Sequence, residues 1–278
     1  MTTPDYVLLG NITADIAPGT RMLGGTVSYS APTAAAFGLQ VGVVTAAAVD
    51  EPLLDDFDPR ITVVRKPAPA TTTFENIYTP EGRIQYIRAV APPLDAGDIP
   101  TDWREARRVH LGPIAAETDP MLAALFPHAR VLLTLQGCLR EWGADGRVHF
   151  RQWFNPDALR HIDLVVFSEE DIAAAPHLEA DYAAAVKHLV VTRAERGGSL
   201  YIDGVRQEYA TPQVTLVHPT GAGDIFAAAL LCALDHVGGD YARACAVAAH
   251  VAAQSVTRMG LQSVPSSEEV RQALSAVV

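Results

Sequence analysis

The sequence predicts an α/β protein in which a mostly parallel sheet is flanked by helices. Short apolar stretches such as residues 6–10 and 131–135 alternate with stretches that favour helix, which is typical of repeated strand–helix–strand units. Glycine-rich turns precede two of the predicted helices, and polar residues follow several of the predicted strands. Open sheets of this class bind ligands at the carboxyl ends of their strands, so a site is expected at these turns and loops.

The composition favours one large cytoplasmic domain. Of the 278 residues, 49% are hydrophobic, and no apolar run is long enough to cross a membrane. Nothing resembling a linker divides the chain, so residues 1–278 are expected to form a single domain. The net charge of −11 argues against nucleic acid as a partner. The three cysteines match no metal or redox spacing, and the amino terminus lacks the pattern of a secretory signal, which favours the reducing cytoplasm.

The amino-terminal part begins with a predicted strand followed by polar residues. Residues 6–10 are a short apolar run that ends in glycine, as expected of a buried strand in a parallel sheet. Asn11 and Asp15 lie in the loop that follows, where a ligand is expected. From the residues alone, Asp15 can either bind a substrate or satisfy the backbone of its own loop.

A glycine pair comes next and precedes a predicted helix. Gly24 and Gly25 allow a substrate hydroxyl to approach the backbone closely. Residues 26–37 are small and apolar, which suits a helix packed closely on a sheet, and Gly38 is a natural end for it.

The middle of the chain predicts a hairpin and then more strands of the parallel sheet. Residues 71–78 and 83–88 have mixed faces around a turn at 79–82, and they carry too much polar surface for the core of a parallel sheet. Residues 109–111 and 164–167 are typical of buried strands, with a helical stretch expected at 120–126, as in strand–helix–strand units.

The second glycine turn is the main candidate for chemistry. Residues 215–217 are expected to end a strand, and Ala222 begins a stretch that favours helix. Gly221 and Gly223 leave amide groups unpaired at the positive end of this helix, which is a site for an anion such as phosphate. Asp224 lies in the middle of this end, where a carboxylate either caps the helix or takes a proton from a substrate hydroxyl.

Residues 219–224, which read Pro-Thr-Gly-Ala-Gly-Asp and continue into a small-residue helix, resemble the signature of the ribokinase family, also called the PfkB carbohydrate kinases. A second family signature, a glycine pair that opens a helix near the amino terminus, has its counterpart in residues 23–31. The resemblance covers most of the chain. It implies a ribokinase-like three-layer fold with a small β-sheet lid formed by insertions at about residues 12–22 and 67–92, and this lid often makes a dimer contact in the family.

The resemblance also implies an activity: transfer of the γ-phosphoryl group of ATP, with Mg²⁺, to a hydroxyl of a small polyol or sugar. Asp224 is then the catalytic base, and Gly221, Ala222 and Gly223 form the anion hole. Thr26 and Tyr29 stand where ribokinase itself has a lysine and an asparagine, which argues against ribose as the acceptor. The candidate acceptor-binding residues are Asn11, Asp15, Gly24, Gly25, Tyr29 and Arg140. For Arg140 the alternative is a solvated side chain on a loop.

For the donor, the family has an asparagine and, three residues on, a glutamate that help to order magnesium and its waters. Ser168 and Asp171 stand at these two positions, and Asp171 keeps the negative charge, so Asp171 is the candidate magnesium residue, acting through water. The same two residues also suit a helix start, with Ser168 as the cap. The candidate nucleotide-binding residues are Ser168, Thr192, Gly197 and Thr220.

Several alternatives can be weighed from the sequence. Lys66 and Lys187 are the only lysines and lie in no P-loop motif, which excludes that class of kinase. A nucleoside kinase of the same fold and a sugar- or nucleoside-binding protein without phosphoryl transfer remain open, although a pure binder has no need of Asp224. Residues 72–85 and 136–142 look most like the branch of the family that contains myo-inositol kinases, so an inositol-like acceptor is the leading expectation.

Overall fold

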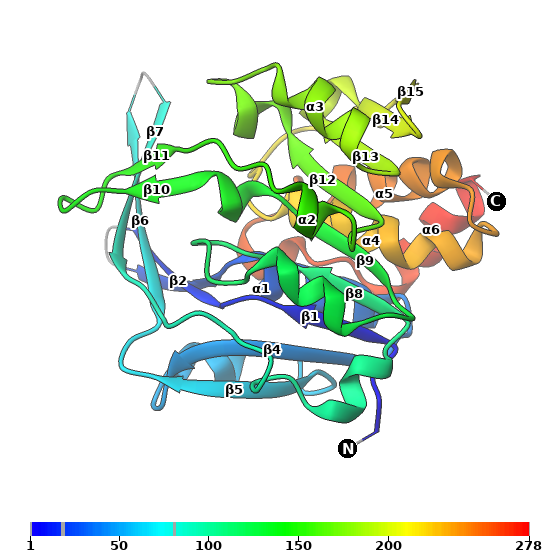
Figure 1. The fold of residues 1–278 in the computed structure, drawn as a ribbon. Helices are drawn as coiled ribbons and strands as arrows, with labels where there is room; N and C mark the ends of the chain where they lie inside the picture. Colours follow the sequence, from blue (N-terminus) through cyan, green and yellow to red (C-terminus); the bar gives the residue numbers. More distant parts are fainter. Residues whose placement is uncertain (1, 18–19, 80–81, 278) are drawn as a thin grey trace.

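The computed structural model of the protein describes residues 2–17, 20–79 and 82–277, and a large, mostly parallel sheet lies at its centre (Figure 1). In spatial order its strands are β15 (Val205–Tyr209), β14 (Gly198–Ile202), β13 (His188–Thr192), β12 (Leu164–Ser168), β9 (Arg130–Thr134), β8 (Arg108–Leu111), β1 (Tyr6–Leu9), β4 (Val41–Ala48) and β5 (Thr62–Ala68). The antiparallel pairs described in this sheet are β13–β14 and β14–β15, so β14 runs against both of its neighbours. The predicted α/β class is confirmed.

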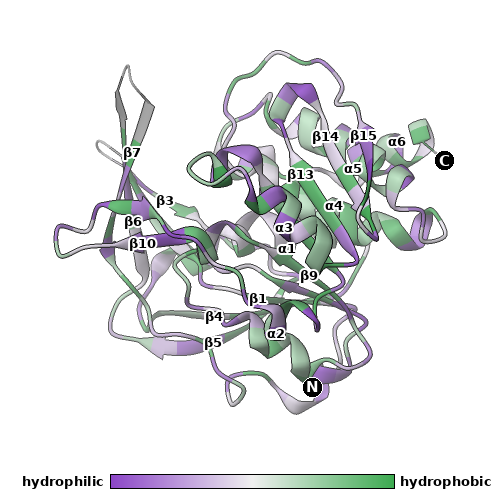
Figure 2. Cartoon of the chain, turned by 45° about the horizontal axis from the view of Figure 1, so that its top comes forward, coloured by the Kyte–Doolittle hydropathy of each residue, from purple (hydrophilic) through white to green (hydrophobic). Residues whose placement is uncertain are grey.

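Helices cover both faces of this sheet. They are α1 (Thr26–Ala36), α2 (Pro156–Leu159), α3 (Leu178–Ala185), α4 (Ala222–His236), α5 (Tyr241–Ser255) and α6 (Ser267–Val277). Successive strand residues point to opposite faces, so Tyr6 and Leu8 pack with α1, α4 and α5, whereas Val7 and Leu9 pack with α2 and α3. The result is three layers with two apolar cores, and Figure 2 shows the apolar strands lying between the helices. Across the described ranges, no helix combines the length and apolar character that a membrane span requires.

A second, smaller sheet stands beside the first, at the left of Figure 1. Its strands, in spatial order, are β3 (Thr20–Gly24), β2 (Thr13–Ala17), β6 (Thr72–Thr79) and β7 (Gly82–Ala89). β6 and β7 form the predicted hairpin, while β2 pairs with β6 in parallel and with β3 antiparallel. The turn residues Pro80 and Glu81, and Pro18 and Gly19 of the predicted first insertion, lie outside the described residues. The small sheet is therefore confirmed, and its action as a lid stays a prediction.

A two-stranded hairpin supports the small sheet from the side of the large one. Its strands β10 (Arg140–Trp142) and β11 (Val148–Phe150) pair antiparallel. The amide of Ile87 in β7 donates to the carbonyl of Gly146 at 2.8 Å, so this hairpin and the small sheet are joined. Phe74 and Ile87 pack beneath the small sheet against Ile114 and Ala115, in an apolar cluster separate from the two main cores.

Two local predictions were wrong or imprecise. Residues 215–217 form no strand, and Leu216 and Val217 are 62% and 55% exposed. The amide of Val217 instead donates to the carbonyl of Val256 at 2.8 Å, because this segment leaves the sheet to reach the end of α5. The helical stretch expected at 120–126 is a 3₁₀ helix. The 3₁₀ helices described are η1 (Pro52–Asp56), η2 (Thr101–Glu105), η3 (Pro120–Leu125), η4 (Gln136–Leu139), η5 (Glu169–Ile172), η6 (Ala194–Arg196) and η7 (Gly260–Ser263).

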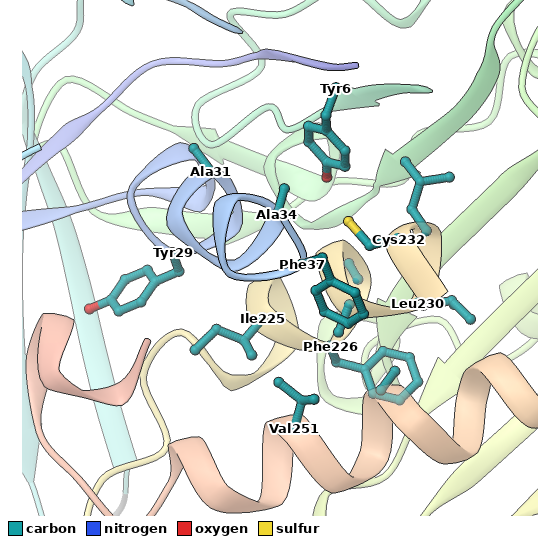
Figure 3. Close-up of a cluster of buried hydrophobic side chains, with 14 of the residues drawn as sticks. Tyr6, Tyr29, Ala31, Ala34, Phe37, Ile225, Phe226, Leu230, Cys232 and Val251 are labelled. Carbon is teal, nitrogen blue, oxygen red and sulfur yellow. The ribbon is translucent and has the colours of Figure 1, made fainter. Parts of the chain in front are cut away.

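Close packing of three helices brings the two glycine motifs together. Figure 3 shows side chains of α1, α4 and α5 in one cluster, with Tyr29, Ile225 and Val251 contributed by the three helices. Alanines at many contact positions of α1 and α4 permit this close approach. The hydroxyl of Ser30 in α1 donates to the carbonyl of Asp224 in α4 at 3.0 Å. The starts of these two helices are therefore neighbours, although 194 residues separate the bonded pair.

Candidate active site

The second glycine turn has a conformation that only glycine adopts comfortably. Gly221 precedes α4 with a φ of 85°, in the left-handed region. A Cβ atom at Gly221 would lie 2.4 Å from the ring of Tyr29, so the ring packs directly on this backbone. At Gly223 a Cβ atom would meet nothing within 4 Å, so this side of the turn faces open space. The amide of Ala222 donates to the carbonyl of Pro219, while the following amides begin a helix and lack intrahelical partners.

Asp224 lies in the first turn of α4, and the pKa of its carboxyl group is higher than usual. Burial raises its pKa to about 6, as the largest of several effects. A hydrogen bond from the Thr26 side chain and the positive charge of Arg140 act to lower this pKa, and the negative charges of Asp171 and Asp15 act to raise it. Residues from widely separated parts of the sequence therefore converge on one carboxylate. At neutral pH this group is ionised but still basic enough to accept a proton.

The first glycine pair holds the other side of this site. The Oδ2 atom of Asp15 lies 2.5 Å from the position that a Cβ atom of Gly24 would take, and its Oδ1 atom accepts a hydrogen bond from the Thr13 hydroxyl at 2.9 Å. Gly25 has a φ of 86°, and a Cβ atom there would lie 2.8 Å from the carbonyl oxygen of Asn11. Both glycines are thus required by the close approach of neighbouring groups, and Asp15 is held in β2, an inner strand of the small sheet.

Asn11 lies beneath the surface of the site. Its side chain is 0% exposed, and its Oδ1 atom accepts a hydrogen bond from the amide of Ala46 at 2.7 Å. This contact ties the end of β1 to β4. The Nδ2 atom is buried and has no hydrogen-bond partner among the described residues. Direct binding of the acceptor by Asn11 stays a prediction.

Tyr29 and Arg140 are both fixed in place by contacts with other residues of the chain. Tyr29 is 4% exposed and supports the glycine turn from below. Arg140 is half-buried, and its Nη1 atom donates to the carbonyl of Ile114 at 3.0 Å. Its guanidinium also lies over the ring of Phe74, 5.4 Å from the ring centre. Arg140 is therefore not a freely solvated loop arginine, and it acts electrostatically on Asp224.

On the donor side, Ser168 and Asp171 form the helix start that their sequence allows. Ser168 caps η5, and the Oδ2 atom of Asp171 accepts from the amide of Ser168 at 2.9 Å. The Oδ1 atom of Asp171 accepts from the side chain of Gln136 at 2.9 Å. Each oxygen keeps a lone pair that can accept a water molecule bound to magnesium. Within the described ranges no group of three or more His, Cys, Asp or Glu residues could hold a metal ion directly, so the donor set fits magnesium only through water and phosphates.

The other predicted nucleotide-binding residues lie at neighbouring strand ends. Thr192 ends β13 and pairs in register with Ser168 at the end of β12. Gly197 has a φ of 83°, and a Cβ atom there would lie 2.0 Å from the carbonyl oxygen of Tyr209, which accounts for glycine without a ligand. The amide of Thr220 faces the Nδ1 atom of His218 at 3.4 Å. Their contacts with phosphate groups stay predictions.

A cavity of about 270 Å³ opens beside this cluster. It lies between β7, the β10–β11 hairpin and η5, and its lining includes Arg140 and Asp171, two of the three residues whose charges act on Asp224. Its lining residues are Ile84, Gln85, Gln136, Leu139, Arg140, Arg147, Val148, His149, Phe150 and Asp171. Amide, guanidinium and imidazole groups thus face a space of ligand size, and Arg140 and Asp171 connect it electrostatically to Asp224, which does not line it.

The sequence analysis did not identify three residues that shape this site. Thr26 bonds Asp224, and its place directly after the glycine pair was the available signal. Gln136 bonds Asp171, and Glu117 accepts the amide of Asn11 at 3.0 Å. Nothing in the local sequence marks these last two, because Asp171 and Asn11 are distant in the chain and the burial of Glu117 appears only in the fold.

Two curated proteins are similar to the chain in sequence. A cytidine kinase of Thermococcus kodakarensis is 27% identical over 246 residues, covering 82% of this chain and 87% of the relative. A fructokinase of Escherichia coli is 29% identical over 161 residues, covering 52% of this chain and 51% of the relative. Residues 152–268 match the family described as pfkB family carbohydrate kinase.

Solved structures share the fold. A pyrophosphate-dependent kinase in the ribokinase family, complexed with a pyrophosphate analog and myo-inositol, superposes with a TM-score of 0.79 at 21% identity, covering 96% of this chain and 99% of that one. A ribokinase from Thermotoga maritima gives a TM-score of 0.78 at 21% identity, covering 98% and 99%.

These findings confirm the resemblance to the PfkB carbohydrate kinases and the ribokinase-like fold. The chain is a phosphotransferase that uses an alcohol group as its acceptor, and it is similar to the PfkB carbohydrate kinases over residues 152–268. Within that class it is a sugar or nucleoside kinase.

The two glycines of the second turn should respond differently to alanine. Gly221→Ala places a methyl group against the Tyr29 ring in a left-handed backbone, so it should destabilise the protein by roughly 1–3 kcal/mol and lower turnover. Gly223→Ala adds its methyl group to open space, so it should leave stability within about 0.5 kcal/mol of the wild type but lower turnover by obstructing the anion hole. Urea unfolding and kinase assays on both variants check this. Equal stability of the two variants would contradict it.

Proposed function

We propose that the protein transfers the γ-phosphoryl group of ATP to a hydroxyl of a small polyol or sugar, with an inositol-like ring as the leading acceptor. The observation that carries the proposal is Asp224, a carboxylate with a pKa of about 6 at the positive end of α4. It lies beside the backbone of the glycine turn and within electrostatic reach of Asp15 and Arg140. A base, an anion site and a hydroxyl-binding carboxylate are the parts that phosphoryl transfer to an alcohol requires.

In the proposed reaction, Asp224 removes the proton from the acceptor hydroxyl. The oxygen uses its electron pair to form a bond to the γ-phosphorus, and the bond from that phosphorus to the bridging oxygen breaks, so ADP leaves with the electron pair. The sequence predicted the amides of Gly221, Ala222 and Gly223 as the anion hole, but the amide of Ala222 donates to the carbonyl of Pro219. We therefore propose the amides of Gly223 and Asp224 as the donors to the phosphoryl oxygens while negative charge spreads over them. Asp15 accepts hydrogen bonds from other hydroxyls of the acceptor and so orients the ring.

Magnesium is the expected metal, and Asp171 holds it through water. Asp171 is fixed from both sides by Ser168 and Gln136, so its position does not depend on the metal. When bound, the ion neutralises charge on the donor phosphates.

ATP is proposed as the donor because apolar surface borders the glycine turn. Leu216 and Met259 are 62% and 60% exposed, and the coil that carries Leu216 is bonded to the end of α5 and runs directly into the turn. A nucleotide base can cover such surface, whereas pyrophosphate would leave it in water. Activity with pyrophosphate and none with ATP would refute this donor.

A nucleoside is the second candidate acceptor. Leu139, Val148 and Phe150 give the cavity an apolar side that suits a base, and the similar cytidine kinase acts on a nucleoside. The amide and guanidinium groups of Gln85, Gln136 and Arg147 favour a polyhydroxylated ring instead. We further propose that the reaction takes place in the cytoplasm and that the small sheet is a lid that also forms a dimer contact.

The function is tested by a screen of polyols, sugars and nucleosides against ATP and pyrophosphate, with acceptor-dependent release of ADP or phosphate as the readout. Acceptor-dependent ADP release with inositols or hexoses supports the proposal, and release only with nucleosides selects the second candidate. If ligands raise the thermal stability but no phosphoryl transfer occurs, the protein is a binding protein without catalysis.

Asp224→Asn should lower kcat by roughly 100-fold or more, since the amide cannot accept the proton. Ligand binding should change little. In the wild type, kcat/KM should rise with pH through about 6, as Asp224 becomes ionised, and reach a plateau above it. Steady-state kinetics between pH 4.5 and 9 check both outcomes. Turnover near that of the wild type would show that Asp224 only caps α4.

The same substitution should stabilise the folded protein in a pH-dependent way. Because the pKa of Asp224 is raised on folding, the folded state binds this proton more tightly, and the free energy of unfolding falls as pH rises from about 4 to about 6. Asn never ionises, so the free energy of unfolding of Asp224→Asn should not fall in this way. The difference in this free energy between variant and wild type should therefore be larger at pH 8 than at pH 4, by up to about 3 kcal/mol. Urea unfolding of both proteins at both pH values measures this difference. The same difference at pH 4 and pH 8 would contradict a raised pKa of Asp224 in the folded protein.

Acceptor binding should slow amide hydrogen exchange in β6 and β7. A lid that excludes water from the reaction prevents wasteful hydrolysis of ATP, so its hairpin should become ordered when the acceptor is bound. Hydrogen exchange with and without saturating acceptor checks this, with β14 and β15 as an internal control. Unchanged exchange in β6 and β7 would argue against a lid.

A further inference from the structure

Glu117 is a buried carboxylate that interacts with backbone amides. It is 3% exposed, and its oxygens accept hydrogen bonds from the amides of Asn11 at 3.0 Å, Ile114 at 3.0 and 3.2 Å and Ala115 at 2.7 Å. No arginine or lysine among the described residues forms an ion pair with it. Burying a carboxylate is costly, and these amides offset that cost only if the loop keeps this geometry.

The amides that Glu117 binds belong to two neighbouring strand ends. Asn11 follows β1 closely, and Ile114 and Ala115 follow β8, which pairs with β1 in parallel. Ala116, which lies between Ala115 and Glu117, has a φ of 56°, a conformation that is uncommon for alanine. The carboxylate closes this strained loop by holding both of its flanks. It therefore fixes the loop at the edge of the sheet where the candidate site lies.

The loop held by Glu117 makes two contacts with the site. The carbonyl of Ile114 accepts the hydrogen bond that anchors Arg140. The side chains of Ile114 and Ala115 pack against Phe74 of the small sheet, whose ring lies beneath the Arg140 guanidinium. The backbone of Glu117 also accepts the amide of Leu94 at 3.0 Å, which fastens the chain after β7 to the same loop.

We propose that Glu117 is a positioning residue for phosphoryl transfer: it shapes the 112–117 loop so that Ile114 directs Arg140 toward Asp224 and the small sheet docks on Ile114 and Ala115. The proposal rests on the proposed kinase function of Asp224. A glutamine at this position offers one acceptor oxygen and one NH₂ group, so the NH₂ group would face a backbone amide, donor against donor. One amide would then lose its partner, and the loop would have to change shape.

The test compares Glu117→Gln with Asp163→Asn, a matched control. Asp163 also has a carboxylate oxygen that accepts a backbone amide between neighbouring strands, from Val131 at 2.8 Å, but it precedes β12 and so lies at the opposite edge of the sheet. Both substitutions replace a carboxylate that accepts a backbone amide by an uncharged amide, but Asp163 is half-buried and an asparagine there can keep the bond from Val131 through its carbonyl oxygen. Only the first changes the loop whose Ile114 carbonyl anchors Arg140.

The first measurement is the pKa of the Asp224 carboxyl group, by NMR titration of the full chain with ¹³C-labelled aspartate. The groups that act on it are Arg140, which lowers it, and Asp171 and Asp15, which raise it. Moving Arg140 away should raise the pKa in Glu117→Gln and in Arg140→Met, with no further rise in the double variant. Asp163→Asn should match the wild type. This measurement needs no acceptor, so it stands even if the wild type transfers no phosphoryl group.

The second measurement is turnover with the acceptor found in the screen. Glu117→Gln should lower kcat by roughly 10- to 100-fold while Asp163→Asn keeps normal turnover, because small misplacements at a reacting centre are costly. A folded Glu117→Gln protein with an unchanged Asp224 pKa and unchanged kcat would overturn the proposal. If Glu117→Gln does not fold by circular dichroism, Arg140→Met decides: an unchanged Asp224 pKa in that variant would overturn it equally.

Discussion

The contact between the Tyr29 ring and the backbone of Gly221 is the constraint on which the site depends. It requires glycine at 221, since a Cβ atom would lie 2.4 Å from the ring, and it places the start of α4 against α1. Because α1 begins directly after Gly25, the same contact brings the two glycine motifs together. The hydroxyl of Ser30 then bonds the carbonyl of Asp224 and fixes the angle between the helices. The packing of these helices thus makes the proposed anion site and the proposed hydroxyl-binding site neighbours.

The electrostatics of the site follow from this packing. Asp224 lies in the first turn of α4, and burial is the largest of the effects that raise its pKa to about 6. Two further carboxylates, Asp15 and Asp171, add negative charge and act to raise the pKa of Asp224. The positive charge of Arg140 acts to lower this pKa and so opposes them. Substrates that bring a metal ion and hydrogen-bond donors would relieve the excess of negative charge, which favours their binding. The position of Arg140 is accordingly as important as that of the base.

The sequence predicted what depends on neighbouring residues and missed what depends on distant ones. The strands, the β6–β7 hairpin and both glycine-opened helices follow from local apolar patterns and backbone preferences, and the structure confirms them. Glu117 and Gln136 were not recognised, because a glutamate or glutamine in a loop has no local mark of burial until the fold supplies its partners. Residues 215–217 were predicted as a strand because they are β-branched and apolar, which normally indicates burial.

The exposure of those apolar residues is informative about the donor. Leu216 and Val217 are exposed because the coil after β15 crosses to the end of α5 before it turns into Gly221. There the carbonyl of Val256 accepts the amides of Val217 and His218. Exposed aliphatic side chains cost free energy, and Met259, directly before η7, adds further exposed apolar surface. A strand at 215–217 would have buried them in the sheet but moved the glycine turn away from Tyr29. The chain therefore keeps the turn in place and leaves apolar surface beside it, where a nucleotide base can cover it.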